Sequence, residues 1–433
     1  MVKHITQTFI TRVITAFLML VLVLLCTNTL PPGEYGTIGL IVLDISLIML
    51  LNDLIGGSAM VYYTSRLNTF WLAGIGYLWA FMTLFIAAGT GLILSLFPVL
   101  FSIIIPGGFG IHILVLALIN SFSTIHINIL IGKEKISKYN VAFLVQIGSL
   151  IILVAILLFL FRIRTASMYI DALYGSYLLT WITGIVFTRK YFRPGSFSEI
   201  RSVISTIAKY GTFTQLANLI QLGNKRFNFY VIKALHGVAP LGIYNAAIQV
   251  TEGLRIIGQS VSLIQFSRIS RQQDQTYSRD LTIRLLKMTI LCTLILLIAM
   301  MAIPESIYAW IFGEQYRMIH TLVYCLAPGI LSLNASMLMS SFFSGTGRPR
   351  YNMIASGIGF LFTLITIFPA VYFWNYLGAG LTTSIAYILS TIYQLTKFVK
   401  ITGARRRDFI IRISDFTLFL QFIRMEFPGR SEK

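Results

Sequence analysis

Apolar segments long enough to cross a lipid bilayer recur along almost the whole chain. Of its 433 residues, 56% are hydrophobic and 11% are charged, whereas a soluble domain carries about 25% charged residues. A membrane-spanning helix needs about 20 consecutive apolar residues, and such stretches leave little sequence for a soluble domain. The composition therefore predicts an all-α protein that crosses a membrane many times.

The apolar segments predict twelve transmembrane helices. They lie near residues 9–30, 36–63, 71–97, 109–131, 140–161, 169–190, 206–234, 240–266, 283–303, 318–344, 352–374 and 379–399. Lysine and arginine gather in alternate connections, so the positive-inside rule places both termini in the cytoplasm. Arg162 and Arg164 violate the pattern, and Lys233 is counted among the few external charges. The net charge of +19 thus reflects membrane topology and argues against nucleic-acid binding.

A short pattern before the fifth predicted helix recurs before the eleventh. Gly132–Lys135 precedes a Tyr-Asn pair at 139–140, and Gly347–Arg350 precedes a Tyr-Asn pair at 351–352. The repeat predicts two six-helix lobes around a central cavity, and an even number of spans makes the lobes parallel repeats. The expected organisation is an N-terminal lobe over 1–195, a C-terminal lobe over 196–400 and an amphipathic cytoplasmic tail over 401–433.

Two adjacent cations lie in the middle of the seventh apolar segment. Lys225 and Arg226 interrupt residues that should otherwise face lipid. A charge at a helix centre costs about 2.5–3.5 kcal/mol on insertion scales, while an ordinary apolar residue returns only about 0.3–0.6 kcal/mol. The pair is therefore expected to face a watery cavity or an anionic partner, which predicts a transporter with an anionic cargo.

Polar side chains form a stripe on both the seventh and the eighth predicted helix. Spacings of three and four residues place each set on one helix face. With a basic residue of the first helix, the cargo-binding candidates are Arg12, Asn218, Gln221, Lys225, Arg226, Asn228, Gln249, Glu252, Arg255 and Gln259. The alternative is that the stripes are polar contacts between helices, with Glu252 paired to Arg255, and that Arg12 anchors its helix at the membrane surface.

Two carboxylates lie inside the second predicted helix. Asp44 and Asp53 are candidates for ion coupling, because an intramembrane carboxylate can bind a proton or a cation. The alternative is that each pairs with a basic residue of a neighbouring helix.

Signals of an enzyme are poor. The five histidines are scattered without metal-ligand spacing, and no nucleotide-binding or hydrolase motif occurs. Cys26, Cys292 and Cys325 all fall inside predicted helices and suggest neither a disulfide framework nor a metal site. We therefore expect a protein that is not an enzyme and that uses no cofactor and no metal.

Four motifs along the chain resemble those of polysaccharide flippases. They are LPPGEYG at 30–36, LIGGSAMVYY at 54–63, LGIYNAA at 241–247 and SGTGRPR at 344–350. Their order and spacing are similar to those of the polysaccharide, or O-antigen, flippase family of the multidrug/oligosaccharidyl-lipid/polysaccharide exporter superfamily. The resemblance covers nearly the whole chain.

The resemblance implies two six-helix lobes around a V-shaped cavity and transport by alternating access. The implied cargo is undecaprenyl-diphosphate-linked oligosaccharide, moved from the inner to the outer leaflet of a bacterial inner membrane for surface polysaccharide or lipopolysaccharide. Basic cavity residues of the family bind diphosphate and acidic sugars, a role that Lys225, Arg226 and Arg255 would take here. Membrane lipids and other polysaccharide-assembly proteins are the further partners.

Three alternatives to a flippase remain. One is a cation-coupled multidrug exporter of the same fold. Another is a membrane glycosyltransferase or polymerase, which would need catalytic carboxylates and a large external loop that the sequence does not suggest. A non-transporting scaffold is the third, and the charged stripes argue against it.

Overall fold

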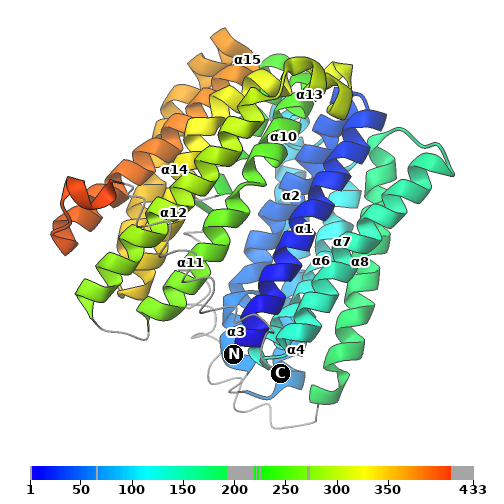
Figure 1. Cartoon of the computed structure of the whole chain (residues 1–433). Helices are drawn as coiled ribbons and strands as arrows, with labels where there is room; N and C mark the ends of the chain where they lie inside the picture. The colour runs from blue at the N-terminus through cyan, green and yellow to red at the C-terminus, as the bar shows by residue number, and fades with distance from the viewer. Residues whose placement is uncertain are drawn as a thin grey trace, which may run out of the picture. The chain divides into compact units, whose positions relative to one another are not determined.

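The described part of the chain is almost entirely helical. The computed structural model describes residues 2–64, 67–192, 219–220, 222–223, 226–270 and 274–410, and no strand occurs among them. Figure 1 shows the helices in chain order. The predicted fold class, an all-α membrane protein, is confirmed at this level.

The helices have the following bounds in chain order. They are α1 (Val2–Thr29), α2 (Pro32–Gly56), α3 (Ser58–Thr64), α4 (Thr69–Ser95), α5 (Pro98–Ile104), α6 (Gly110–Gly132), α7 (Ile136–Phe159), α8 (Ala166–Thr188), η1 (Arg189–Tyr191), a helix over 226–236, α10 (Val238–Glu252), α11 (Arg255–Ile269), α12 (Gln275–Ala302), α13 (Glu305–Phe312), η2 (Glu314–Tyr316), α14 (Ile319–Gly345), α15 (Arg350–Thr402) and η3 (Arg406–Phe409).

Nine helical segments among the described residues are long and apolar enough to cross a membrane. They are Thr11–Thr29, Pro32–Thr64, Thr69–Ser95, Gly110–Gly132, Ile136–Phe159, Ala166–Tyr191, Gln275–Ala302, Glu314–Gly345 and Arg350–Thr402. The last has 53 residues and is interrupted at Asn375, whose φ of 51° and ψ of −140° are not helical. The twelve-helix layout in two parallel lobes stays a prediction.

The chain divides into two compact units. The first unit consists of residues 3–246 and 311–316, and the second mainly of residues 247–310 and 317–433. The division falls inside α10, between Ala246 and Ala247. The lobe boundaries expected from the sequence stay a prediction.

In the first unit, α6 packs against α2, α3, α4 and α8. Its buried face is mostly apolar, and Ile125 and Ile129 are fully buried against Met60 and Leu72. Lipid is as apolar as these side chains, so close packing rather than exclusion of water holds the helices together. Small residues permit that packing, since a Cβ on Gly76 of α4 would lie 3.1 Å from Ile125.

A buried histidine joins three helices of the first unit. Tyr77 on α4 lies 2.6 Å from His126 Nε2 on α6, and His126 Nδ1 lies 2.7 Å from the hydroxyl of Thr188 on α8. Trp181 donates to the Tyr77 oxygen, and Thr188 donates to the carbonyl of Gly184. These bonds fix the proton positions: Tyr77 donates to Nε2, and the neutral imidazole donates from Nδ1. His126 is therefore a fully bonded structural residue.

The turn between α1 and α2 is tied to several distant segments of the first unit. The Tyr316 hydroxyl donates to the carbonyl of Leu30 over 3.1 Å, and the Tyr316 ring packs edge-on against Tyr35. Glu34 accepts a 2.6 Å hydrogen bond from the backbone N–H of Ala166. A carboxylate at that position satisfies an unpaired N–H of α8 and complements its dipole.

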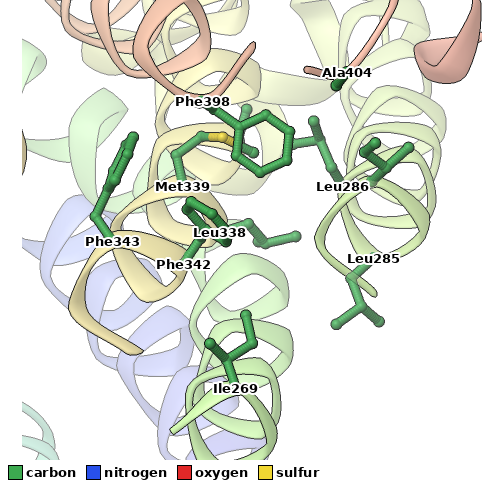
Figure 2. Close-up of a cluster of buried hydrophobic side chains, with 11 residues drawn as sticks. Ile269, Leu285, Leu286, Leu338, Met339, Phe342, Phe343, Phe398 and Ala404 are labelled. Carbon is green, nitrogen blue, oxygen red and sulfur yellow. The ribbon is translucent and has the colours of Figure 1, made fainter. Parts of the chain in front are cut away.

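The second unit is built around α14, which packs against α11, α12 and α15. Figure 2 shows the buried cluster where these helices meet. The Phe342 and Phe398 rings lie edge-to-face with centroids 4.8 Å apart, and Leu286 of α12 and Ile269 of α11 belong to the same cluster. The cluster fixes α11 and α14 beside each other, which matters for the site described next.

Candidate functional site

The eighth predicted helix is broken in the structure. The sequence predicts one helix over 240–266, but α10 ends at Glu252 and α11 begins at Arg255, with a turn at Gly253 and Leu254. The N–H of Leu254 donates to Thr251, three residues back, so the helical ladder is interrupted here. Breaks of this kind inside membrane helices form binding sites in many transporters.

A side chain from α14 completes the interrupted ladder. Asn334 is fully buried, and its Oδ1 accepts the N–H of Gly258 over 2.9 Å. Its Nδ2 lies 3.5 Å from the carbonyl of Leu254. In a regular helix those two backbone groups would bond to each other. Gly258 is required for the insertion, because a Cβ there would lie 2.3 Å from Asn334 Oδ1.

Replacing Asn334 with leucine should destabilise the second unit. The change keeps the volume but removes both polar atoms, and a buried N–H without a partner costs about 1–3 kcal/mol. We expect a lower melting temperature of the purified protein in detergent. The control is Ser332→Ala, which removes only a hydroxyl that bonds within α14 to Pro328. Equal melting of Asn334→Leu and wild type would show that the amide does not support the break.

Charged residues flank the break on both sides. Arg255 Nη1 lies 3.2 Å from Glu252 Oε2, and the Tyr387 hydroxyl lies 3.4 Å from the other Glu252 oxygen. The Arg255 side chain is 24% exposed, and its Nε has no hydrogen-bond partner among the described residues. Arg255 also begins α11, where the helix dipole favours an anion. Gln249 and Gln259 lie half-buried on either side.

The candidate residues before the break differ in their surroundings. Asn218, Gln221 and Lys225 lie outside the described residues. Arg226 is half-buried, with its guanidinium 5.1 Å from the centroid of the Phe229 ring. The cargo-binding role of all the predicted residues stays a prediction.

Two further candidates have simple surroundings. Asn228 is fully buried and donates to the Tyr244 hydroxyl over 3.1 Å. That bond joins the 226–236 helix to α10 and is of the kind that holds membrane helices together. Arg12 lies half-buried on α1.

The candidate coupling residue Asp44 lies in a polar cluster that the sequence did not reveal. It is 6% exposed, and its Oδ1 accepts a 2.5 Å hydrogen bond from Tyr230. Lys233, one helical turn beyond Tyr230, is close enough for its charge to act on Asp44. Asp53 is half-buried next to Asn52, and its place in the sequence puts it on the opposite side of α2. The structure does not bring the two aspartates together.

The prediction that Lys233 belongs to an external connection is wrong. The helix over 226–236 continues through Lys233, and its Nζ is buried. The connection to α10 is the single residue Gly237, whose φ of 85° is readily adopted only by glycine. The predicted segment over 206–234 already contained Lys233, so counting it as a loop charge was the error, and Gly237 was the available signal for the true end of the helix.

The first turns of α2 and α10 are in backbone contact. A Cβ on Gly36 would lie 2.2 Å from the carbonyl oxygen of Val238, and one on Gly242 would lie 1.9 Å from that of Pro32. One turn further along α2, a Cβ on Gly39 would lie 2.8 Å from Nδ2 of Asn245. Glycines thus permit the approach that places the 226–236 helix beside α2 and Asp44.

The fold is shared with solved structures of membrane transporters. The chain matches a structure described as lipid II flippase MurJ in an inward closed conformation, with a TM-score of 0.71, 17% identity, and coverage of 100% of this chain and 94% of that one. It matches the inward-facing conformation of a multidrug resistance MATE family transporter of the MOP superfamily, with a TM-score of 0.64, 14% identity, and coverage of 92% and 100%. The outward-facing conformation of such a MATE transporter gives a TM-score of 0.59, with 14% identity and coverage of 93% and 97%.

The chain thus shares its fold with these transporters, and the nine long apolar helical segments among its described residues are those of a multi-pass membrane protein. Residues 252–427 match the family model described as "Polysaccharide biosynthesis protein". The predicted resemblance to polysaccharide flippases is thereby confirmed for the family model and the fold. No curated protein sequence matches the chain.

Proposed function

We propose that the protein is a flippase for undecaprenyl-diphosphate-linked oligosaccharide. It would move this lipid from the inner to the outer leaflet of a bacterial inner membrane by alternating access between two six-helix lobes, for surface polysaccharide such as O-antigen. The observation that carries the proposal is the break between α10 and α11, which puts Arg255 at a helix N-terminus. The match to a polysaccharide biosynthesis family model and the fold shared with a lipid II flippase support it.

The chemistry of the break suits a diphosphate. The dipole of α11 favours an anion at its N-terminus, and an arginine can hold two phosphate oxygens at once. Gln249 and Gln259 supply amides that can hydrogen-bond sugar hydroxyls. Glu252 bonds to Nη1 of Arg255, so the other N–H donors of the Arg255 guanidinium can bind the cargo.

In this proposal Lys225 and Arg226 also bind the anionic part of the cargo. Loss of one charge-assisted hydrogen bond costs about 1.5–3 kcal/mol, or about ten- to a hundredfold in affinity. Arg226→Ala should impair surface polysaccharide more than Lys225→Ala, because arginine binds phosphate with two parallel bonds. The Lys225→Glu/Arg226→Glu variant should be inactive.

The measurement is surface polysaccharide in a deletion strain that expresses each variant at matched protein level. The deletion strain should also accumulate lipid-linked oligosaccharide on the inner leaflet. Leu219→Ala is the control, because Leu219 is an exposed apolar residue on the same segment. Full polysaccharide output from the double glutamate variant would refute the role of these two cations.

A cation-coupled multidrug exporter is the second candidate. The observations that favour it are the MATE match and the buried carboxylate Asp44. Drug sensitivity of the deletion strain separates the two functions. A flippase predicts loss of surface polysaccharide with unchanged drug sensitivity, whereas an exporter predicts the reverse.

A further inference from the structure

Asp44, Tyr230 and Lys233 form a polar group that we call the Asp44 cluster. Two of its side chains, Asp44 and Lys233, have a buried polar atom without a hydrogen-bond partner among the described residues. Tyr230 satisfies Oδ1 of Asp44, but Oδ2 is buried without a hydrogen-bond partner among the described residues. The Nζ of Lys233 is also buried and donates to none of them. A carboxylate and an ammonium thus lie within reach of each other's charge, in the first unit, without a bond between them.

Three arrangements can relieve a buried carboxylate of this kind. It can pair with a nearby cation, bind a metal ion or take up a proton. Hard metal ions demand several oxygen ligands, and here Tyr230 already donates its proton to Oδ1 while the Lys233 ammonium competes for the same negative charge. A proton, in contrast, can bind to a single oxygen, and Oδ2 of Asp44 has no hydrogen-bond partner among the described residues. The cluster therefore suits exchange between a lysine partner and a proton.

Within the described ranges, no charged side chain other than Lys233 acts on Asp44. α2 also packs against α3, α4, α6 and α8, where Tyr77 and His126 bond to each other and Asp171 is exposed. Tyr230 and Lys233 are the polar and charged groups that act on Asp44 within the described ranges. The remaining titratable groups on these helices are Glu34, Tyr35 and Asp53 on α2, Tyr62 and Tyr63 on α3, His112 on α6, and Tyr169, Tyr174 and Tyr177 on α8. The first turns of α10, which also contact α2, carry Tyr244.

We propose that the Asp44 cluster is a proton-binding site that senses the position of the 226–236 helix. When Lys233 approaches, Asp44 is ionised and pairs with it. When the helix moves away, Oδ2 takes one proton from water, Lys233 keeps its own protons, and the return of Lys233 releases the proton to water. The inference rests on the proposed transport function, for which it supplies the coupling ion.

Infrared difference spectroscopy on the full-length protein in lipid nanodiscs tests the link between Lys233 and Asp44. Lys233→Met removes the ammonium at similar volume, so it should show the carbonyl absorption of one protonated carboxyl group at neutral pH. The Asp44→Asn/Lys233→Met variant should lack that band. Lys233→Arg should resemble wild type, and Asp53→Asn/Lys233→Met should retain the band as a matched control on α2. Lack of the band in Lys233→Met, or its removal by sodium ions, would overturn the proposal.

A distance measurement tests whether the proton moves the helix. Spin labels at Gly33, where a side chain meets open space, and at exposed Leu235 report the separation of α2 and the 226–236 helix. Acidification should lengthen the wild-type distance, and Asp44→Asn should show the longer distance at every pH. If the distance in the wild type does not change with pH, the Asp44 cluster is a structural contact and the proposal is wrong. Neither measurement uses the cargo, so a wrong cargo would leave both results intact.

Discussion

Gly242→Ala should abolish transport and sharply reduce the yield of folded protein. The new Cβ would lie 1.9 Å from the carbonyl oxygen of Pro32 and 2.7 Å from its carbon. Both are backbone atoms, so no side chain can rotate away, and α10 must separate from α2. Overpacking in a tight core costs about 1–3 kcal/mol and occasionally more, and this contact also positions the 226–236 helix beside Asp44. Gly36→Ala should behave similarly, because its Cβ would lie 2.2 Å from the carbonyl oxygen of Val238.

The matched control for this prediction is Gly33→Ala, in the same turn of α2 as Gly36. A Cβ at Gly33 has no other atom within 4 Å, and alanine is the better helix former, so stability should be unchanged or slightly raised. Monodisperse yield, melting temperature and surface polysaccharide are measured for all three variants. If Gly242→Ala matched Gly33→Ala in these measurements, the backbone contact between α2 and α10 would not be needed for folding.

Exchanging Glu252 and Arg255 should preserve folding and still abolish transport. The Glu252→Arg/Arg255→Glu variant keeps an i,i+3 ion pair at the break. It also puts the cation at the end of α10 and the carboxylate at the start of α11, as helix dipoles prefer. A structural ion pair would therefore be restored. A cargo phosphate at the N-terminus of α11 would instead meet a negative charge, so we expect polysaccharide output near that of the deletion strain.

Two single variants complete the design of the exchange. Arg255→Gln should lose most output with little change in melting temperature, whereas Glu252→Gln should retain much of it because Arg255 is then free of its partner. Recovery of normal output in the exchange variant would identify the pair as a structural contact and remove Arg255 from the cargo site.

The spans that apolar length alone defines were predictable from the sequence. The predicted helix over 109–131 corresponds to α6 at Gly110–Gly132, and the one over 318–344 to α14 at Ile319–Gly345. Bilayer thickness fixes such lengths, and hydropathy reports them directly. The predicted gap between 374 and 379 also contains the break at Asn375.

The break at Gly253 and Leu254 was not predictable in the same way. A single glycine is common in membrane helices, and the residue that completes the interrupted ladder is Asn334, far along the chain. The short α5 and α13 helices were also missed, because hydropathy assigns only segments long enough to span. Local sequence cannot report such long-range insertions.

The site was predictable only in part. Asp44 was found because an intramembrane carboxylate is conspicuous in a hydropathy reading. Its partner Lys233 was assigned to a loop, since a charge near the end of an apolar run reads as its boundary. Tyr230 carries no such signal, because a tyrosine in a membrane helix is ordinary.

The motif at 30–36 owes its residues to folding and not to cargo. The carbonyl of Leu30 accepts a bond from Tyr316, Glu34 caps α8, Tyr35 packs on Tyr316, and Gly36 admits the backbone of α10. Each of these four positions holds helices together. A search with this motif would consequently gather proteins that share an architecture, whatever they transport. Under the proposed function, classifying such proteins by substrate would rely on the residues around the α10–α11 break instead.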